Sequence, residues 1–280
     1  MGIRTDLITE RQELHTGRTT QAETRERHIG SVKIKTVVID NEEAARELEK
    51  PQGKYITVEY RNISDAASDS SLKQALISSL AELMPTRTGV LVVGLGNRDI
   101  TPDAIGPLTV DRLLATRHIG KALRESLGLE GLNSISALIP GVLGKTGIEA
   151  VEIIRGTAAR ISPAAIIVID ALAARHTERL CRTVQLSNTG ISPGSGVENA
   201  RKEISEKVLG IPVIAIGIPT VVDIRTLIYD LTESSKPIDA MMVTPTDIDL
   251  QIRRSAELLA QSLNLFLQPA LDEATLQSLV

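Results

Sequence analysis

The sequence predicts an α/β fold in which a layered, mostly parallel sheet carries helices on both faces. Short apolar runs rich in valine and isoleucine, such as residues 89–95 (GVLVVGL) and 164–169 (AAIIVI), are typical of strands covered on both faces. Beyond residue 85 these runs alternate with segments of helical periodicity. This alternation favours a parallel sheet, because each crossover connection places a helix on one of its faces.

Residues 1–83 are expected to form an N-terminal arm followed by two strands and two helices. Residues 1–30 are polar with little apolar periodicity, so we expect an N-terminal arm outside the core and a single α/β domain over residues 31–280. Within that domain, the run VKIKTVVI predicts a strand and is followed by an acidic helix, a PQGK turn, a second strand and a helix that ends near a proline. These elements are expected at 32–39, 41–50, 55–60 and 71–83.

The rest of the chain repeats the order strand, loop, helix. Apolar, β-branched runs predict strands at 90–95, 134–138, 166–169, 183–186 and 213–216. Helical spacing of apolar residues predicts helices at 108–118, 148–161, 221–231 and 247–266. Three glycine-rich loops, at 94–107, 140–147 and 187–196, are long for plain connections. Long loops at the ends of a sheet commonly carry function.

The composition narrows the class of protein. The net charge is −4 and the chain has no tryptophan, so neither a basic surface nor aromatic stacking platforms favour direct binding to nucleic acid. The single cysteine, Cys181, excludes an internal disulfide and fits a reducing compartment. No apolar run reaches about 18 residues and the first thirty residues carry no signal-peptide core, so we expect a cytoplasmic protein without a membrane partner.

Two aspartates follow the most apolar strands. Asp170 comes directly after residues 164–169, Asp103 lies in the loop after residues 89–95, and each is followed by alanine. The carboxyl ends of parallel strands are where ligands and chemistry collect. A single aspartate there commonly caps a helix or forms a turn. Two close carboxylates can instead share a proton, so that one acts as a base and the other as an acid on a water molecule and a carbonyl group.

Other motifs carry weaker signals. GLGN at 94–97 resembles a phosphate-binding loop, but Asp99 stands where the third glycine is needed. GISPG at 190–194 matches the serine-hydrolase elbow, but Pro193 lacks the N–H group that its oxyanion hole requires. Cys181 has apolar neighbours and predicts a buried side chain. The four histidines lack metal-ligand spacing, so neither a metal nor a cofactor is expected.

Six blocks of sequence, in order, resemble the germination proteases of spore-forming bacteria. They are GLGNRDITPDAIGP (94–107), IPGVLGKTGIEAVEII (139–154), VIDALAAR (168–175), LSNTGISPGSGVENARKEIS (186–205), LGIPVIAIGIPTVVD (209–223) and MVTPTDID (242–249). The resemblance implies an atypical aspartic endopeptidase with a fold similar to that of hydrogenase maturation proteases. It implies that the substrates are the small acid-soluble proteins that coat DNA in the spore core. The catalytic aspartates of the family fall on Asp103, in the T-P-D-A-x-G-P motif, and on Asp170, in I-D-A-L-A.

The resemblance also implies regulation. Family members are inactive, homotetrameric zymogens that remove an N-terminal propeptide themselves. The matching stretch here is RTDL at 4–7, with the cut expected between Asp6 and Leu7, so that only residues 1–6 would be removed.

The loops supply further candidate site residues. Their glycines could offer main-chain groups to an extended peptide and to an oxyanion, or could simply turn the chain. These candidates are Gly141, Gly144, Gly147, Gly190, Gly194 and Gly196. Thr101-Pro102-Asp103 predicts the start of a helix, whose N–H groups favour a carboxylate and therefore favour Asp103 as the base. Asp99 is a third acid that could take the same role.

Two alternative functions stay open at this point. A maturation-type peptidase could use the same acids as ligands for a metal that its substrate carries. A non-catalytic α/β protein that binds peptides or nucleotides could use the aspartates as helix caps.

Overall fold

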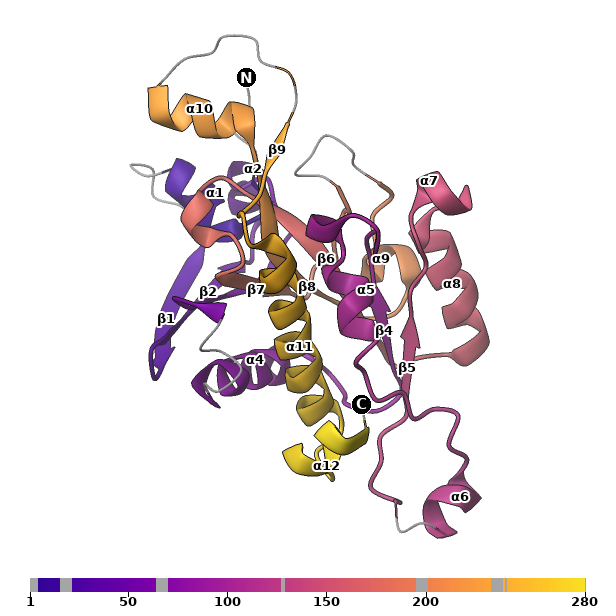
Figure 1. Ribbon diagram of the computed structural model, residues 1–280. Coiled ribbons are helices and arrows are strands. Elements are labelled where there is room, and N and C mark those ends of the chain that lie inside the picture. Colours follow the sequence, from indigo (N-terminus) through magenta and orange to yellow (C-terminus); the bar gives the residue numbers. More distant parts are fainter. Residues whose placement is uncertain are drawn as a thin grey trace.

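The computed structural model describes residues 5–15, 22–63, 70–126, 129–194, 201–232, 239 and 241–279. Within these residues nine strands form one sheet in the order β1-β2-β3-β7-β8-β6-β4-β5, with β9 paired to β8 (Figure 1). Helices flank this sheet, which confirms the α/β class. No helix among the described residues is long and apolar enough to cross a membrane.

One half of the sheet is parallel. It consists of β4 (Val90–Gly94), β5 (Ile135–Leu138), β6 (Ala165–Ala174) and β8 (Val213–Asp223). All residues of β4 are buried, as the valine-rich run predicts for a strand covered on both faces. Strands β6 and β8 both continue past their predicted ends, because residues 170–174 pair with residues 217–222. Asp170 therefore lies inside β6 and does not follow it.

The other half of the sheet is antiparallel, so the sheet is mixed. Its strands are β1 (Glu23–Ile29), β2 (Val32–Ile39), β3 (Gly53–Glu59), β7 (Thr183–Ser187) and the short β9 (Met242–Val243). Three strand pairings are parallel and five are antiparallel. The prediction of a mostly parallel sheet is therefore correct only for β4, β5, β6 and β8, where helices connect parallel strands.

Helices cover both faces of the sheet. On one face lie α4 (Ser70–Leu83), α5 (Ile105–Val110) and α11 (Ile248–Leu267) (Figure 1), which share one apolar cluster with alternate residues of β4 such as Val90 and Val92. On the other face α8 (Ala150–Ile161) packs on Leu91 and Val93. The remaining helical segments are α1 (Ile8–Leu14), α2 (Glu42–Glu47), η1 (Thr101–Asp103), α6 (Lys121–Ser126), α7 (Leu143–Thr146), η2 (Thr177–Arg179), α9 (Glu206–Leu209), α10 (Ile224–Thr232) and α12 (Glu273–Leu279).

Two helices differ from their predicted extents. The helix expected at 108–118 ends at Val110, because later N–H groups bond elsewhere: Leu114 donates to the Asn264 side chain at 3.0 Å and Thr116 donates to the Ile135 carbonyl at 3.0 Å. The helix expected at 221–231 begins only at Ile224, because β8 continues to Asp223.

The N-terminal segment is the main departure from the sequence prediction. Residues 1–30 predict an arm outside the core, whereas Leu7 and Ile8 are fully buried and β1 adds a strand to the sheet. The polar composition of β1 has a simple reason: it is the edge strand, and most of its side chains are exposed. Burial in α1 depends on partners more than a hundred residues away, such as Gln185, whose side-chain oxygen accepts the Ile8 N–H at 2.7 Å.

Candidate active site

The two aspartates singled out by the sequence line one cavity. Its volume is about 520 Å³, and both Asp103 and Asp170 are on its wall. Asp103 ends the short 3-10 segment η1, and Asp170 lies in β6 next to the point where β4 ends. The parallel half of the sheet therefore brings together two acids that are far apart in the sequence.

Gly106 allows the segment that carries Asp103 to approach the sheet. A Cβ atom at this position would lie 2.3 Å from the carbonyl oxygen of Leu95 and 2.6 Å from that of Ile169. The same two residues are joined by a hydrogen bond, in which the Leu95 N–H donates to the Ile169 carbonyl at 2.8 Å. Only glycine leaves room for this contact, so the position fixes how close η1 and α5 lie to β6.

Asp103 is half-buried and holds one strong hydrogen bond. Its Oδ2 atom accepts the N–H of Asn97 at 2.8 Å. Burial raises the pKa of Asp103, and the Asn97 N–H opposes that rise because it favours the carboxylate. The donor lies in the GLGN loop and not at the start of a helix, so the hydrogen bond that favours Asp103 as the base is not the one expected from Thr101-Pro102-Asp103.

Asp170 is more deeply buried, with 5% of its surface exposed. Burial raises its pKa well above the ordinary value, and the negative charges of Asp103 and Asp6 raise it further, against the opposing effect of the Ala171 N–H. The protonated form of Asp170 is therefore favoured more strongly than that of Asp103.

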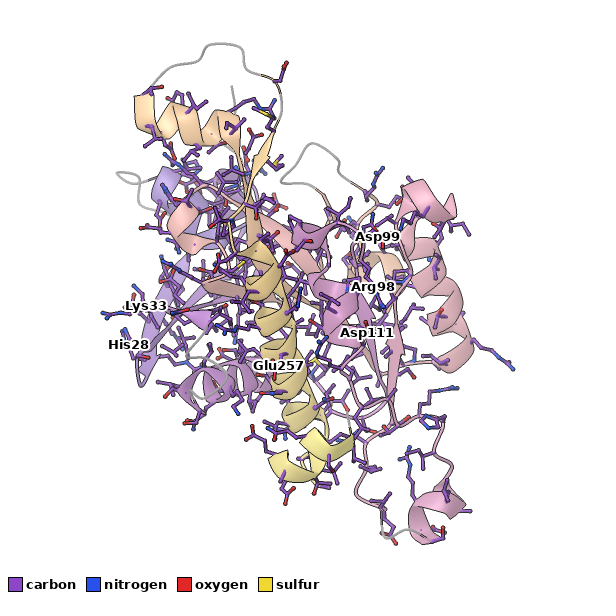
Figure 2. The ribbon with its side chains drawn as sticks, in the orientation of Figure 1. His28, Lys33, Arg98, Asp99, Asp111 and Glu257 are labelled. Atoms are coloured by element: carbon purple, nitrogen blue, oxygen red, sulfur yellow. The ribbon has the colours of Figure 1, made fainter. Side chains whose placement is uncertain are left out.

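Asp99 lies away from this pair. Its side chain, labelled in Figure 2, is 70% exposed, and it forms an ion pair with Lys145 of α7. The hydrogen bond from Lys145 lowers the pKa of Asp99. Two further carboxylates among the described residues line the same cavity: Glu149 and Asp6, of which Asp6 was expected only at a cleavage site.

Asp6 is held by the main chain of β6. Its N–H donates to the Ala173 carbonyl at 2.9 Å, and its Oδ2 atom accepts the Ala173 N–H at 2.9 Å. The pairing of β6 with β8 shifts register between Leu172 and Ala173, and such irregularities re-aim main-chain groups. The next residue, Leu7, is fully buried in an apolar cluster with Leu172, Ala174, Leu180 and Val222.

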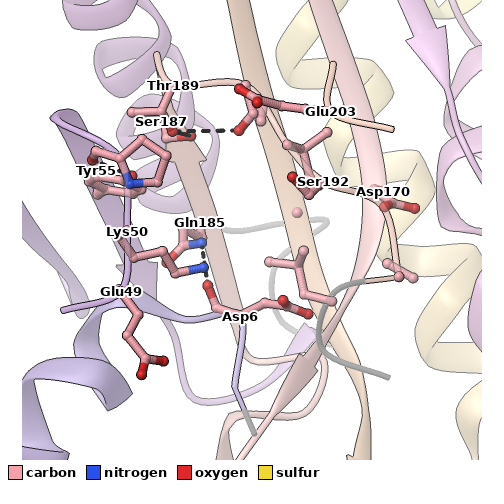
Figure 3. Close-up of a pocket in the computed structure, with 18 residues that line it drawn as sticks. Asp6, Glu49, Lys50, Tyr55, Asp170, Gln185, Ser187, Thr189, Ser192 and Glu203 are labelled. Atoms are coloured by element: carbon pink, nitrogen blue, oxygen red, sulfur yellow. Dashed lines mark hydrogen bonds between the residues drawn. The ribbon is translucent and has the colours of Figure 1, made fainter. Parts of the chain in front are cut away.

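A second cavity, of about 240 Å³, adjoins the first and shares Asp6, Asp170 and Leu172 with it (Figure 3). Its wall includes Gln185 of β7 and Lys50, neither of which the sequence analysis singled out. Burial lowers the pKa of Lys50, and the charge of Asp6 opposes that shift. The available signal for Gln185 was an amide side chain inside the otherwise strand-like run TVQL.

The glycine candidates divide among several places. Gly141 and Gly144 line the 520 Å³ cavity, Gly190 lines the 240 Å³ cavity and Gly194 lines both. Gly147 is the C-cap of α7 and is not among the described residues on either wall. Gly196 lies outside the described residues.

Among the described residues, the serine, cysteine and metal-ligand motifs considered above do not form a catalytic or metal-binding site. Ser192 follows an isolated bridge between Ile191 and Ile204 and does not end a strand of the sheet. Cys181 is fully buried, and burial raises the pKa of its thiol to about 12. No group of three or more histidine, cysteine, aspartate or glutamate side chains that could hold a metal ion occurs among the residues that the structure describes.

Comparisons with known proteins agree with the resemblance. A sequence model described as "Germination protease" matches residues 4–236. The germination protease of Caldanaerobacter subterraneus subsp. tengcongensis is 40% identical, covering 100% of this chain and 98% of that protein. The germination protease of Clostridium tetani is 38% identical, covering 97% of each. Among solved structures, the [NiFe] hydrogenase maturation protease HycI from Thermococcus kodakarensis is similar over 66% of this chain and 98% of that chain, with 17% identity and a TM-score of 0.39. The chain therefore belongs to the germination protease family of peptidases.

Proposed function

We propose that this protein is an aspartic endopeptidase in which Asp103 and Asp170 activate water. The observation that carries the proposal is the meeting of these two acids on one cavity wall, where Asp170 is almost completely buried. Their unequal environments support unequal roles. Asp170, with the more strongly raised pKa, is the acid, and Asp103, which accepts the Asn97 N–H, is the base.

The proposed reaction proceeds in two steps. Asp103 takes a proton from water while the water oxygen bonds to the scissile carbonyl carbon, and Asp170 gives its proton to the carbonyl oxygen. In the second step the C–N bond breaks, Asp103 passes its proton to the leaving nitrogen, and Asp170 recovers a proton from a hydroxyl of the intermediate. Both groups end in their starting protonation states.

We further propose that the substrates are small acid-soluble spore proteins, that the site of action is the cytoplasm of the spore core, and that the protein is a homotetramer. Membership in the germination protease family and the six matching sequence blocks support this proposal. Cleavage between Asp6 and Leu7 to activate a zymogen, and a peptidase domain over residues 31–280, belong to the same proposal.

The test is to replace each acid by its amide. Asp103→Asn and Asp170→Asn should fold normally and cut a purified small acid-soluble spore protein at least about 10³-fold more slowly than the unmodified chain, because each loses a proton-transfer group. Mass spectrometry of the products measures the rate. The matched control is Asp249→Asn, on the exposed side of the first turn of α11, which should cut at the normal rate.

Near-normal turnover by either active-site variant would overturn the dyad. Loss of activity in a strong chelator would instead support the metal-dependent alternative. Binding of the substrate without any cleavage at several pH values would support the non-catalytic alternative.

A further inference from the structure

Residues 5–7 lie in the site in the manner of a bound peptide, and α1 begins at the next residue, Ile8. Leu7 has an extended backbone, with φ −83° and ψ 128°. Asp6 exchanges hydrogen bonds with both main-chain groups of Ala173. Proteins that bind extended peptides use the same two devices, main-chain hydrogen bonds for affinity and side-chain pockets for selectivity.

Gln185 holds this segment by its main chain. Its Nε2 group donates to the carbonyl oxygen of Asp6 at 3.1 Å (Figure 3), and its Oε1 atom accepts the N–H of Ile8 at 2.7 Å. One amide side chain therefore satisfies the carbonyl of one residue and the N–H group two residues later. The amide group of a glutamine offers a donor and an acceptor side by side whatever the pH, which suits this arrangement.

The remaining contacts complete a groove. The Leu7 side chain fills an apolar pocket formed by Leu172, Ala174, Leu180 and Val222. Asp6 and Gln185 line the 240 Å³ cavity, and Asp6 also lines the 520 Å³ cavity together with Asp103 and Asp170. The groove that holds residues 5–8 is thus continuous with the wall that carries both acids.

We propose that Gln185 is a substrate-positioning residue that, together with the main chain of Ala173, clamps an extended peptide beside Asp170, and that residues 5–8 of this chain occupy the clamp. The proposal rests on the proposed peptidase function. Gln185 and the Ala173 carbonyl bind the main chain of the segment, so these contacts fit many sequences, whereas the Ala173 N–H binds the Asp6 carboxylate and the Leu7 pocket selects a large aliphatic side chain. A substrate has to displace residues 5–8 before it can bind.

The first experiment measures binding of a synthetic peptide. A fluorescent peptide with the sequence of residues 4–10, RTDLITE, is titrated into the full chain and into Leu7→Asp, which places a charge in the apolar pocket and drives the segment out. The peptide should bind Leu7→Asp at least about tenfold more tightly than the unmodified chain, because the clamp is then free. Equal affinity for both chains would overturn the proposal.

The second experiment tests Gln185 directly. Adding Gln185→Leu to Leu7→Asp should weaken peptide binding about tenfold, because two hydrogen bonds are lost, and Gln185→Glu should give an intermediate affinity, because it can still accept the N–H. In cleavage assays, KM should rise while kcat changes little. The matched control is Gln277→Leu on the exposed side of α12, which should change nothing. Unchanged affinity in the Gln185 variants would refute the clamp.

Hydrogen exchange gives a readout if Leu7→Asp does not fold. In full-length Asp103→Asn, saturating RTDLITE peptide should speed exchange of the Ile8 amide, which Gln185 protects. Saturation without any change at this amide would place the peptide elsewhere. Peptide binding requires no catalysis, so its outcome is separate from that of the aspartate variants: a clamp that depends on Gln185 can stand even if the dyad fails, and the reverse also holds.

Discussion

The parallel and antiparallel halves of the sheet contribute different parts of the site. The parallel half supplies Asp170, inside β6 and next to the end of β4, and the loop that follows β4 supplies Asp103, at an edge where α/β sheets commonly place their chemistry. The antiparallel half supplies Gln185 on β7, and α1 packs near β3. The two candidate catalytic acids thus belong to the parallel half, whereas the N-terminal segment is bound by residues of both halves, Ala173 of β6 and Gln185 of β7.

The two halves also differ in how they are held together. In the parallel half, close main-chain packing at Gly106 brings η1 to β6. At the N-terminal segment, whose α1 lies near the antiparallel strand β3, a buried carboxylate joins α1 to the residues that follow β6: Glu10 accepts the N–H groups of Arg175 at 2.7 Å and His176 at 3.0 Å, and lies 3.4 Å from the Arg179 guanidinium. The difference suggests that acid geometry and groove occupancy can be altered separately.

The largest expected effect is loss of this buried carboxylate. Glu10→Ala should lower the free energy of unfolding by about 3 kcal/mol, because it leaves two main-chain N–H groups and the Arg179 guanidinium without their buried partner. Urea denaturation measures the loss. Glu13→Ala, one turn later on α1 and 40% exposed, should cost about 1 kcal/mol or less although it also contacts Arg179. Equal losses would show that burial of Glu10 does not secure α1.

The next effect tests the parallel half. Gly106→Ala should lower kcat/KM by about 10²-fold, because the new methyl group meets two carbonyl oxygens and moves Asp103 away from Asp170. The matched control is Gly156→Ala in α8, where a Cβ atom meets nothing within 4 Å; it should keep full activity and gain about 0.5 to 1 kcal/mol of stability. Full activity in Gly106→Ala would mean that close packing does not set the geometry of the acids.

The same contrast explains what the sequence could predict. The valine and isoleucine runs of the parallel half report burial directly, so β4, the start of β6 and the two acids beside them follow from local composition. The end of β6 does not, because Asp170 and the residues after it are strand only through their pairing with β8.

The N-terminal segment could not be predicted from its own residues. Glu10 is polar and yet fully buried, because its partners Arg175 and His176 lie more than 160 residues away in the chain. Strand β1 lacks apolar periodicity because it is an exposed edge. The amide of Gln185 interrupts a strand-like run, but its role depends on residues 6 and 8, which only the folded chain brings to it.

A smaller effect concerns the stability cost of the buried acid. Because burial raises the pKa of Asp170, the folded chain binds a proton more tightly than the unfolded chain, so the associated stability is present at low pH and is lost as pH rises through the folded-state pKa. Asp170→Asn removes this loss. It should therefore raise the free energy of unfolding by about 1 kcal/mol at pH 8 and by almost nothing near the ordinary aspartate pKa of 3.8. Denaturation at both pH values measures the difference, and an equal gain at both would contradict an ionisation effect.

The smallest expected effect separates Asp99 from the catalytic pair. Asp99→Asn removes an exposed ion pair with Lys145 and leaves the hydrogen bond from the Asn97 N–H to Asp103 in place, so kcat/KM should stay within about twofold of the unmodified chain. The pH dependence of kcat/KM distinguishes Asp99 from Asp103 as the base more clearly than the value of kcat/KM at one pH. If Asp99 served as the base, its amide would remove the acid limb of the profile, whereas with Asp103 as the base that limb keeps its midpoint, above 3.8 because burial raises the pKa of Asp103. An unchanged acid limb in Asp99→Asn would exclude Asp99 as the base, and a lost limb would contradict the assignment of that role to Asp103.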